Sequence, residues 1–451
     1  MSTRTPTPEQ QAAIDAAGEV LVSASAGSGK TFVMIEKMIA LILSGKADVS
    51  SVLAVTFTNL AAGEMKERLR AALSARINAE PDPAVRARLK AQLSEVPSAD
   101  VCTLHAFCVN VIRRYFYEAG IDGNFRVLEE TEADKLRERA VARAFDALIE
   151  QDSPRFASLC RAFAGSRGFG RLREVVRKAH EKVISRADYT DFLGGIAAKY
   201  TESAFDALAA EALAPVRAAA ERLRGKCIAL SAACEPFLRA GLFTEKHVAF
   251  LEGRRALAEE VLAAEDVFAA AKLFEGLKLM SKPPNTKLKA AGSEEALALD
   301  ERMASLKEEV DGLKKMLAAF RPREEELAAF LSSGEIAAGL AEAVLAYDAE
   351  YAALKRRAGG LDFSDLEHKC LALLEIPRVG AEVRGRYTHV FVDEYQDVNP
   401  AQERILSLVA GENVFMVGDA KQSIYGFRGC SPAFFSEKYE LLRGEGRALT
   451  L

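Results

Sequence analysis

Residues 24–31 read Ala24-Ser25-Ala26-Gly27-Ser28-Gly29-Lys30-Thr31 and form a glycine-rich loop in the sequence. The loop follows the apolar run Val20-Leu21-Val22 and precedes residues 32–39, whose apolar spacing is typical of a helix. A strand that enters such a loop and continues into a helix is the context that a phosphate cradle requires. We therefore predict that residues 24–31 bind a nucleotide.

The residue types of the loop indicate how it would hold ATP with Mg²⁺. Gly27 and Gly29 allow the backbone N–H groups to point inward. Lys30 supplies a positive charge for the β- and γ-phosphates, and Thr31 supplies a hydroxyl ligand for Mg²⁺. The general pattern has glycine where this chain has Ala24, so the loop alone leaves a plain surface turn as an alternative.

Composition limits the class of protein. The chain has 451 residues, of which 49% are hydrophobic and 28% charged, which suits a globular protein of two or three domains. It has no run of about eighteen apolar residues and no apolar leader at the N-terminus, so we expect a cytoplasmic protein without a membrane segment. The seven cysteines are scattered without a C-x-x-C pair, which favours free thiols and predicts no metal besides Mg²⁺.

Ahead of the loop, Thr7-Pro8-Glu9-Gln10 predicts the start of a short helix capped by Thr7. The carboxamide of Gln10 donates and accepts at once, which suits an adenine edge. A solvated polar helix face is the alternative.

Two further strands are predicted after the loop, at 51–56 and 99–103. Phe57 and Asn59 follow the first, and His105 follows the second. Open parallel sheets place their ligands at the carboxyl ends of strands. Phe57 could therefore stack on a base or seal the core, Asn59 could cap the next helix, and His105 could bind a ligand or be structural.

The sequence changes character between about 116 and 379, where it becomes rich in Ala, Leu, Glu, Lys and Arg. This composition predicts a helical domain. Its clearest feature is an apolar seam with 3-4-3-4-3 spacing, which we interpret as packing within the domain: Met303, Leu306, Val310, Leu313, Leu317 and Phe320.

Acidic residues follow the next predicted strand, 388–392. Asp393 at its end could hold Mg²⁺, and Glu394 could orient and deprotonate an attacking water. A charged surface loop is the alternative, but it is disfavoured by the phosphate loop predicted in the same sheet.

The last predicted strand, 413–417, enters a loop that mixes amide, aromatic and guanidinium groups. Gln422 could sense a γ-phosphate, and Arg428 could pair with a phosphate or an acid. Tyr425 and Phe427 could stack on bases or serve as core aromatics.

The distance in sequence between the loop at 24–31 and the acids at 393–394 requires a large insertion. We therefore expect an α/β fold in which residues 1–115 and 380–451 form one parallel P-loop sheet and 116–379 form an all-α insertion.

Five ordered motifs resemble the UvrD/Rep-type DNA helicases of superfamily one. Residues 7–10 resemble their adenine-reading motif, and 56–65, with Phe57, Thr58 and Asn59, resemble a motif that binds single-stranded DNA, although Leu60 replaces the usual lysine. Residues 392–397 and 417–429 are the most specific matches, and Ala24 is usual in the family's phosphate loop. Residues 23–26, 104–108, 124–128 and 421–423 look more like the AddA/RecB helicase–nuclease branch.

The resemblance implies a RecA-like subdomain 1A (1–115 and 380–451) with a helical subdomain 1B (116–379). It implies an ATP-dependent 3′–5′ helicase in double-strand-break repair and recombination, acting on single-stranded DNA and on junctions of single- and double-stranded DNA, with an AddB-like or RecC-like partner. By the same resemblance Phe57, Thr58, Asn59, His105, Tyr425 and Phe427 would contact DNA.

In this family a second RecA-like domain with an arginine finger follows a strand resembling 448–451. We therefore expect weak ATPase activity from these 451 residues alone. An ATP-gated module that binds single-stranded DNA without unwinding it is an alternative. A P-loop kinase would leave the 422–428 loop unexplained.

Overall fold

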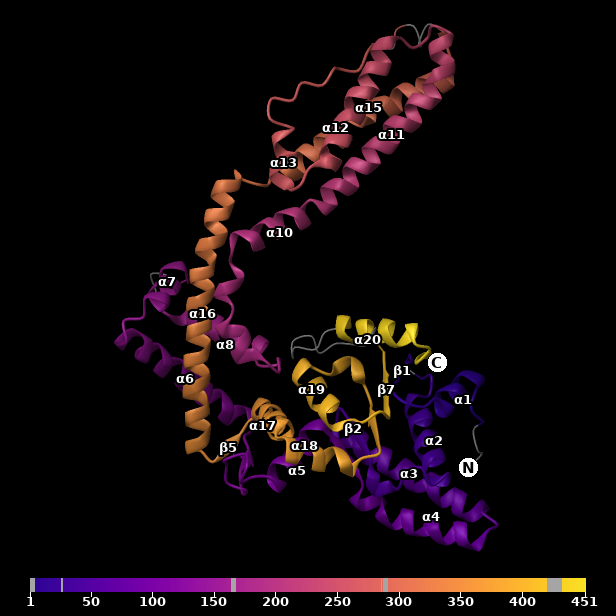
Figure 1. The fold of residues 1–451 in the computed structure, drawn as a ribbon, viewed down its shortest axis with the longest axis vertical. Coiled ribbons are helices and arrows are strands. Elements are labelled where there is room, and N and C mark those ends of the chain that lie inside the picture. The colour runs from indigo at the N-terminus through magenta and orange to yellow at the C-terminus, as the bar shows by residue number, and fades with distance from the viewer. Residues whose placement is uncertain (1–4, 26, 164–167, 285, 287–290, 420–431) are drawn as a thin grey trace. The chain divides into compact units, whose positions relative to one another are not determined.

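The computed structural model describes all residues except 1–4, 26, 164–167, 285, 287–290 and 420–431. The chain, traced in Figure 1, divides into two compact units. The first combines Met1–Leu193 with Glu342–Leu451, and the second is Gly194–Ala341. The boundaries of these compact units differ from those of the subdomains expected from the sequence. The subdomain boundaries remain a prediction.

A six-stranded sheet forms the centre of the first unit. Its order is β3-β2-β6-β7-β1-β8, and all neighbouring strands are parallel. The strands are β1 (Val20–Ser23), β2 (Val52–Thr56), β3 (Asp100–Thr103), β6 (His389–Val392), β7 (Val414–Gly418) and β8 (Ala448–Thr450). Strands from the N-terminal part (β1, β2, β3) and from the C-terminal part (β6, β7, β8) are interleaved in one parallel sheet, so the predicted parallel α/β sheet is confirmed.

Helices cover both faces of the sheet, as parallel strands require. One face carries α1 (Pro8–Asp15), α2 (Lys30–Leu43), α3 (Asn59–Ala79) and α4 (Pro83–Glu95). The other carries α5 (Leu104–Arg114), α17 (Phe363–Glu375), α18 (Pro377–Arg386), α19 (Pro400–Val409) and α20 (Pro432–Gly444). The 3₁₀ helices of this region are η1 (Val49–Ser51), η2 (Val96–Ser98) and η4 (Tyr395–Asp397).

Alternation along β2 explains why the sheet has two separate cores. Leu53 and Val55 pack into the core that includes α5 and α17, whereas Val52 and Ala54 pack into the core that includes α2 and α3. All four side chains are buried, and successive residues of a strand point to opposite faces. The continuous apolar run of β2 is therefore the pattern of a strand covered on both sides.

The first unit also contains helices outside the sheet layers: α6 (Glu130–Glu150), α7 (Pro154–Phe163), α8 (Gly170–Val183) and α9 (Tyr189–Gly194). A short parallel pair, β4 (Arg126–Val127) with β5 (Gly360–Leu361), joins segments at either end of the predicted helical stretch. The sequence did not indicate this pair, because two residues are too few for a strand pattern.

The second unit is helical. Among its described residues are the elements η3 (Ala197–Lys199), α10 (Glu202–Ala212), α11 (Ala214–Arg239), α12 (Glu245–Ala263), α13 (Val267–Lys272), α15 (Glu294–Leu317) and the first part of α16 (Arg323–Arg357). The predicted apolar seam lies on α15, and Met303, Leu306 and Leu313 are buried in the unit's core, while Phe320, beyond the helix end, is partly buried there. The seam thus packs within the chain, as predicted.

Helix α16 (Arg323–Arg357) is, among the described residues, the one helix long and apolar enough to cross a membrane by length and composition. Its C-terminal half carries charges with partners in the first unit. Asp348 Oδ1 lies 2.8 Å from His180 Nε2, and Lys355 Nζ lies 2.7 Å from Asp365 Oδ2. These ion pairs join the C-terminal half of α16 to α8 and α17 of the first unit, where α17 is Phe363–Glu375.

Gly418, the last residue of β7, is held against two neighbours. A Cβ atom at this position would lie 2.5 Å from Gln396 Oε1 and 2.8 Å from a ring carbon of Phe435. We predict that Gly418→Ala lowers the free energy of unfolding by about 1–3 kcal/mol, because both neighbours are packed in the core. Urea unfolding measured by circular dichroism tests this.

Gly411→Ala is the matched control, since a Cβ atom there meets nothing within 4 Å. Equal stability of the two variants would contradict the predicted close packing at Gly418.

Candidate nucleotide site and neighbouring sheet edge

The phosphate loop adopts the backbone that its glycines allow. Gly27 has φ 80° and Gly29 has φ 95°, both in the left-handed region. Gly29 is the N-cap of α2 and, having no side chain, provides no side-chain cap for the first turn of this helix. Together with the helix dipole, this geometry suits a phosphate.

The rest of the loop is tied to its surroundings. Ala24 is buried and its N–H donates to the carbonyl of Gly418 at 2.9 Å. Ser25 is exposed and its carbonyl accepts from the Ser28 N–H at 3.2 Å. The Ser28 hydroxyl is buried without a hydrogen-bond partner among the described residues, as expected where a ligand completes a polar site. Ala26 lies outside the described residues.

Gln10 supports the loop from helix α1. Its Nε2 donates to the Ser28 carbonyl at 2.7 Å, and its Oε1 accepts from the Thr7 N–H at 3.1 Å. Thr7 caps α1, as predicted, in a capping box with Gln10. Only 3% of Gln10 is exposed, and in this structure its amide connects the phosphate loop at Ser28 to the start of α1 at Thr7.

Lys37 anchors the other end of α1 to α2. The sequence interpretation missed this buried lysine, whose Nζ donates to the carbonyls of Ile14 at 3.0 Å and of Ala16. Burial, followed by the charges of Asp15 and Lys46, which act in opposite directions, sets the pKa of Lys37 at about 8. Gln10 and Lys37 together hold α1 against the P-loop helix.

The acids predicted at 393–394 lie beside the loop. Lys30 Nζ donates to Glu394 Oε2 at 2.8 Å, with 12% and 33% of the two side chains exposed. Glu394 has φ 52°, an uncommon backbone conformation for a residue with a side chain. Gln396 Nε2 donates to the same Oε2 at 2.9 Å, so the carboxylate is held toward the lysine.

Asp393 lies next to this pair. Its Oδ1 accepts from the Glu394 N–H at 3.0 Å. Burial, and then the charge of Glu394, raise the pKa of Asp393 to about 6, while Lys30 opposes the rise. Asp393 is therefore a carboxylate of high proton affinity that a nearby cation would ionise.

These residues fit ATP with Mg²⁺. Backbone N–H groups of 27–31 and Lys30 would hold the phosphates, and the Thr31 hydroxyl with Asp393 would hold the metal. Within the described residues no three His, Cys, Asp or Glu side chains gather into a metal site. Mg²⁺ would therefore take further ligands from phosphate and water.

The other predicted residues lie farther along the same edge. Phe57 is half-buried after β2, and Thr58 and Asn59 are exposed. The prediction that Asn59 caps a helix is wrong: Thr58 is the N-cap of α3, accepting from the Ala61 N–H at 3.1 Å, because its backbone is extended while Asn59 is already helical.

His105 lies in the first turn of α5, after β3, and its side chain is 31% exposed. In the order β3-β2-β6-β7-β1, His105 and Phe57 follow adjacent strands, and Lys30 and Glu394 follow strands beyond them. Parallel pairing thus brings both groups of residues to one edge of the sheet, with the nucleotide residues and the predicted DNA residues in separate parts of it.

Comparison with known proteins gives the family. The profile of the UvrD/REP helicase N-terminal domain matches residues 6–442. The chain belongs to this family. The resemblance predicted from the motifs is thereby confirmed, and the parallel sheet is the RecA-like core of this helicase domain.

Curated relatives cover nearly the whole helicase domain. The chain is 34% identical to an ATP-dependent helicase/nuclease subunit from Desulfitobacterium hafniense over 96% of its length and 33% of the relative. Proteins of the same name from Ligilactobacillus salivarius and Latilactobacillus sakei are each 33% identical over 96% of the chain, and over 36% and 50% of their own lengths. The chain thus spans a third to a half of these relatives.

Four predicted residues of the helicase domain, Gln422, Tyr425, Phe427 and Arg428, lie outside the described residues. Their roles stay predictions. The flanking Asp419 is described, and its N–H donates to Gln396 Oε1 at 2.8 Å. Gln396 therefore links the Glu394 loop to the beginning of the segment that contains these residues.

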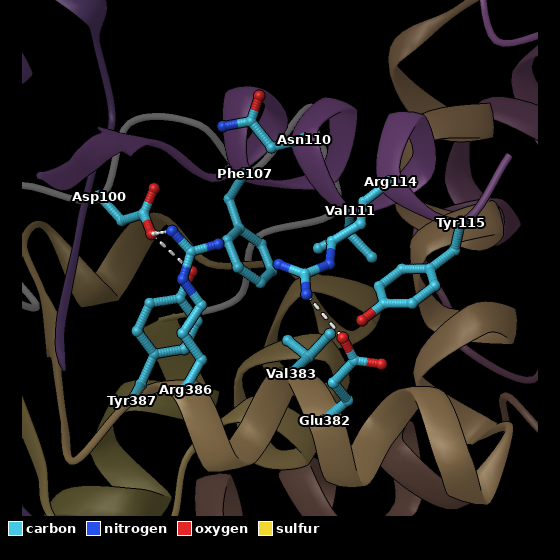
Figure 2. Close-up of a pocket in the computed structure, with 10 residues that line it drawn as sticks. All are labelled: Asp100, Phe107, Asn110, Val111, Arg114, Tyr115, Glu382, Val383, Arg386 and Tyr387. Carbon is cyan, nitrogen blue, oxygen red and sulfur yellow. Dashed lines mark hydrogen bonds and ion pairs between the residues drawn. The ribbon is translucent and has the colours of Figure 1, made fainter. Parts of the chain in front are cut away.

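A pocket of about 460 Å³ in the helicase domain lies at the amino ends of β3 and β6, whereas the P-loop follows the carboxyl end of β1. Figure 2 shows the side chains that line this pocket. Its charged groups are paired with one another. Arg386 lies 2.9 Å from Asp100 Oδ2, which also accepts from the Tyr387 hydroxyl at 2.8 Å. Arg114 pairs with Glu382 at 2.6 Å. These contacts join β3 and α5 to α18 and support the sheet.

We predict a pH-dependent stability that originates at Asp393. Since its folded-state pKa of about 6 exceeds the unfolded value of about 3.9, the folded protein binds this proton more tightly. The resulting stabilisation is fully present below about pH 4 and is lost as the pH rises through 6. Asp393→Asn, which cannot titrate, should therefore gain stability relative to the native chain between pH 4 and 7.

Urea unfolding of both proteins at half-unit pH steps measures this difference in the absence of nucleotide. A stability difference that is constant with pH would show that folding leaves the pKa of Asp393 unchanged, and one that grows toward low pH would show that folding lowers this pKa. Either result would contradict the prediction.

Proposed function

We propose that this chain is the N-terminal motor part of an ATP-dependent DNA helicase with 3′–5′ polarity that acts in double-strand-break repair and recombination. The observation that carries the proposal is the Lys30–Glu394 pair beside a phosphate loop in a member of the UvrD/REP helicase N-terminal domain family. The names of the relatives favour a helicase over the alternative of a DNA-binding module without motor activity.

The residues have separate roles in this proposal. Lys30 would contact the β- and γ-phosphates after exchanging its ion pair with Glu394 for phosphate oxygens. Glu394 would then be free to orient the attacking water and accept its proton. Asp393 and Thr31 would hold Mg²⁺, and Gln422 and Arg428 are proposed to contact the γ-phosphate.

The proposed DNA face consists of Phe57, Thr58, Asn59 and His105, with Tyr425 and Phe427. Its substrates are single-stranded DNA and junctions with duplex DNA. Because the names of the relatives call them subunits, the proposal includes an AddB-like or RecC-like partner. It also includes a cytoplasmic location, as expected from the sequence. The proposed subdomains are 1A at 1–115 and 380–451, and 1B at 116–379.

Lys30→Ala should raise the dissociation constant of a fluorescent ATP analogue at least tenfold, because it removes a charge-assisted contact worth about 1.5–3 kcal/mol. Glu394→Gln should retain nucleotide binding and lose turnover, since an amide cannot accept the proton. Fluorescence titration and a phosphate-release assay measure the two effects.

Lys46→Ala is the control, because it removes an exposed positive charge beyond the C-terminal end of α2, away from Lys30 at its start. ATP binding by Lys30→Ala with native affinity would place the nucleotide elsewhere.

Phe57→Ala should weaken binding to oligo-dT about 5- to 100-fold, because stacking on a base contributes about 1–3 kcal/mol. The slope of affinity against salt should stay unchanged, since phosphate contacts are retained. Fluorescence anisotropy at several salt concentrations measures both quantities.

Tyr117→Ala, which removes an aromatic ring that is 86% exposed elsewhere on the first unit, is the control. An equal loss of affinity in both variants would argue against a base-stacking role for Phe57.

A further inference from the structure

A buried carboxylate, Glu367 on α17, accepts hydrogen bonds from three side chains. His105 Nε2 lies 3.0 Å from its Oε1, which also accepts from Gln402 Nε2 at 2.6 Å. Asn399 Nδ2 donates to Oε2 at 3.1 Å. Only 7% of the Glu367 side chain is exposed. The sequence interpretation missed Glu367, which reads as an ordinary polar residue of an amphipathic helix.

The three donors keep this carboxylate charged. Burial alone would raise the pKa of Glu367, but the hydrogen bonds from His105, Gln402 and Asn399 and the charge of His105 hold the pKa below its usual range. An ionised carboxylate only accepts, so His105 must carry its proton on Nε2. The loss of any one donor would leave a buried charge with fewer partners, which is costly.

Two of the donors also form the cap of α19. The Gln402 N–H donates to Asn399 Oδ1 at 2.8 Å, and the Asn399 N–H donates to Gln402 Oε1 at 3.2 Å. Both ends of each amide are therefore used, and neither side chain can turn without breaking a bond. Asn399 follows η4, the 3₁₀ turn that begins directly after Glu394.

These contacts form a short chain of hydrogen bonds between two parts of the sheet edge. One end is His105, on the proposed DNA face, and the other is the cap of α19, which follows Glu394 along the chain through η4 and Val398. We propose that Glu367 is a positioning residue that couples DNA binding at His105 to the orientation of Glu394. The proposal rests on the proposed function, because it requires DNA at His105 and nucleotide at Lys30.

The physical reason is competition for one proton donor. A DNA phosphate near His105 offers a second acceptor for its Nε2 proton. When His105 turns toward the phosphate, Asn399 and Gln402 alone hold the Glu367 charge, and the cap of α19 must adjust. Because η4 precedes this cap directly, the adjustment reaches Glu394.

A second contact between α17 and α19 provides a control. Glu375 on α17 pairs with Arg404 on α19 at 3.7 Å, and both side chains are about half exposed. Glu375→Gln removes the same charge from the same helix, opposite the same partner helix, without touching His105.

The first experiment measures thermodynamic coupling in the whole chain. The dissociation constant of oligo-dT is measured with and without a non-hydrolysable Mg·ATP analogue, and that of the analogue with and without oligo-dT. In the native chain and in Glu375→Gln, each ligand should change the affinity of the other about fivefold or more. In Glu367→Gln, each ligand should change the affinity of the other by less than about twofold. Each ligand alone should still bind with an affinity within about threefold of the native value.

Gln402→Met serves as the second variant if Glu367→Gln does not fold. It removes one hydrogen-bond donor to Glu367, and Gln402 lies half-buried on α19. It should lose the coupling in the same way. The proposal would be overturned if a folded Glu367→Gln or Gln402→Met variant kept the native coupling. It would also be overturned if the native chain showed no coupling, or if Glu375→Gln lost the coupling to the same extent.

The second experiment needs neither ligand, so it separates failure of this inference from failure of the proposed function. Hydrogen exchange of the backbone amides of 395–402 is compared between the native chain and His105→Phe, and between Glu367→Gln and the double variant. His105→Phe, which keeps a ring but removes the donor to Glu367, should speed exchange severalfold in the native background and change nothing further in Glu367→Gln. Unchanged exchange in the native background would overturn the inference, whereas failure to bind either ligand would overturn the proposed function.

Discussion

The ion pair of Lys30 and Glu394 joins residues 364 positions apart in the chain, and it depends on parallel strand pairing. Strand β7 lies between β1, which precedes Lys30, and β6, which precedes Glu394. The register of Val22 with Val417 and of Val392 with Met416 brings the carboxyl ends of these strands to one edge. Without that register, the phosphate loop and the acids would not meet.

The same constraint explains how polar side chains are supported at this edge. Gln396 is buried between the Glu394 carboxylate and the N–H of Asp419, so one side chain connects the loops after β6 and β7. The close approach at Gly418 leaves room for this amide and for no further side-chain atom. Tight packing of backbone and amide therefore fixes the acids, since a displaced loop would leave buried polar groups without partners.

The contacts of the P-loop and of Glu367 follow a common principle. In both, the side-chain amides of a capping box accept a hydrogen bond at a helix end through their oxygen and donate one to a neighbouring element through their nitrogen. Gln10 donates to the phosphate loop, and Asn399 and Gln402 donate to Glu367. A helix end held in this way transmits a displacement of the neighbour, because its hydrogen bonds are mutually dependent.

The family was predicted from the resemblance of five ordered motifs to UvrD/Rep-type helicases. Local sequence patterns were enough to predict the parallel α/β class, the phosphate loop, and the strand ends that carry Phe57, His105 and Asp393. These patterns are apolar runs of strand length, glycines before a helix, and polar residues directly after a strand. The fold was needed to show which strand ends are neighbours, that Glu394 faces Lys30, and that His105 contacts Glu367. A buried carboxylate whose three donors come from residues far apart in the chain leaves no local pattern, because its stability comes from partners that tertiary contacts bring together.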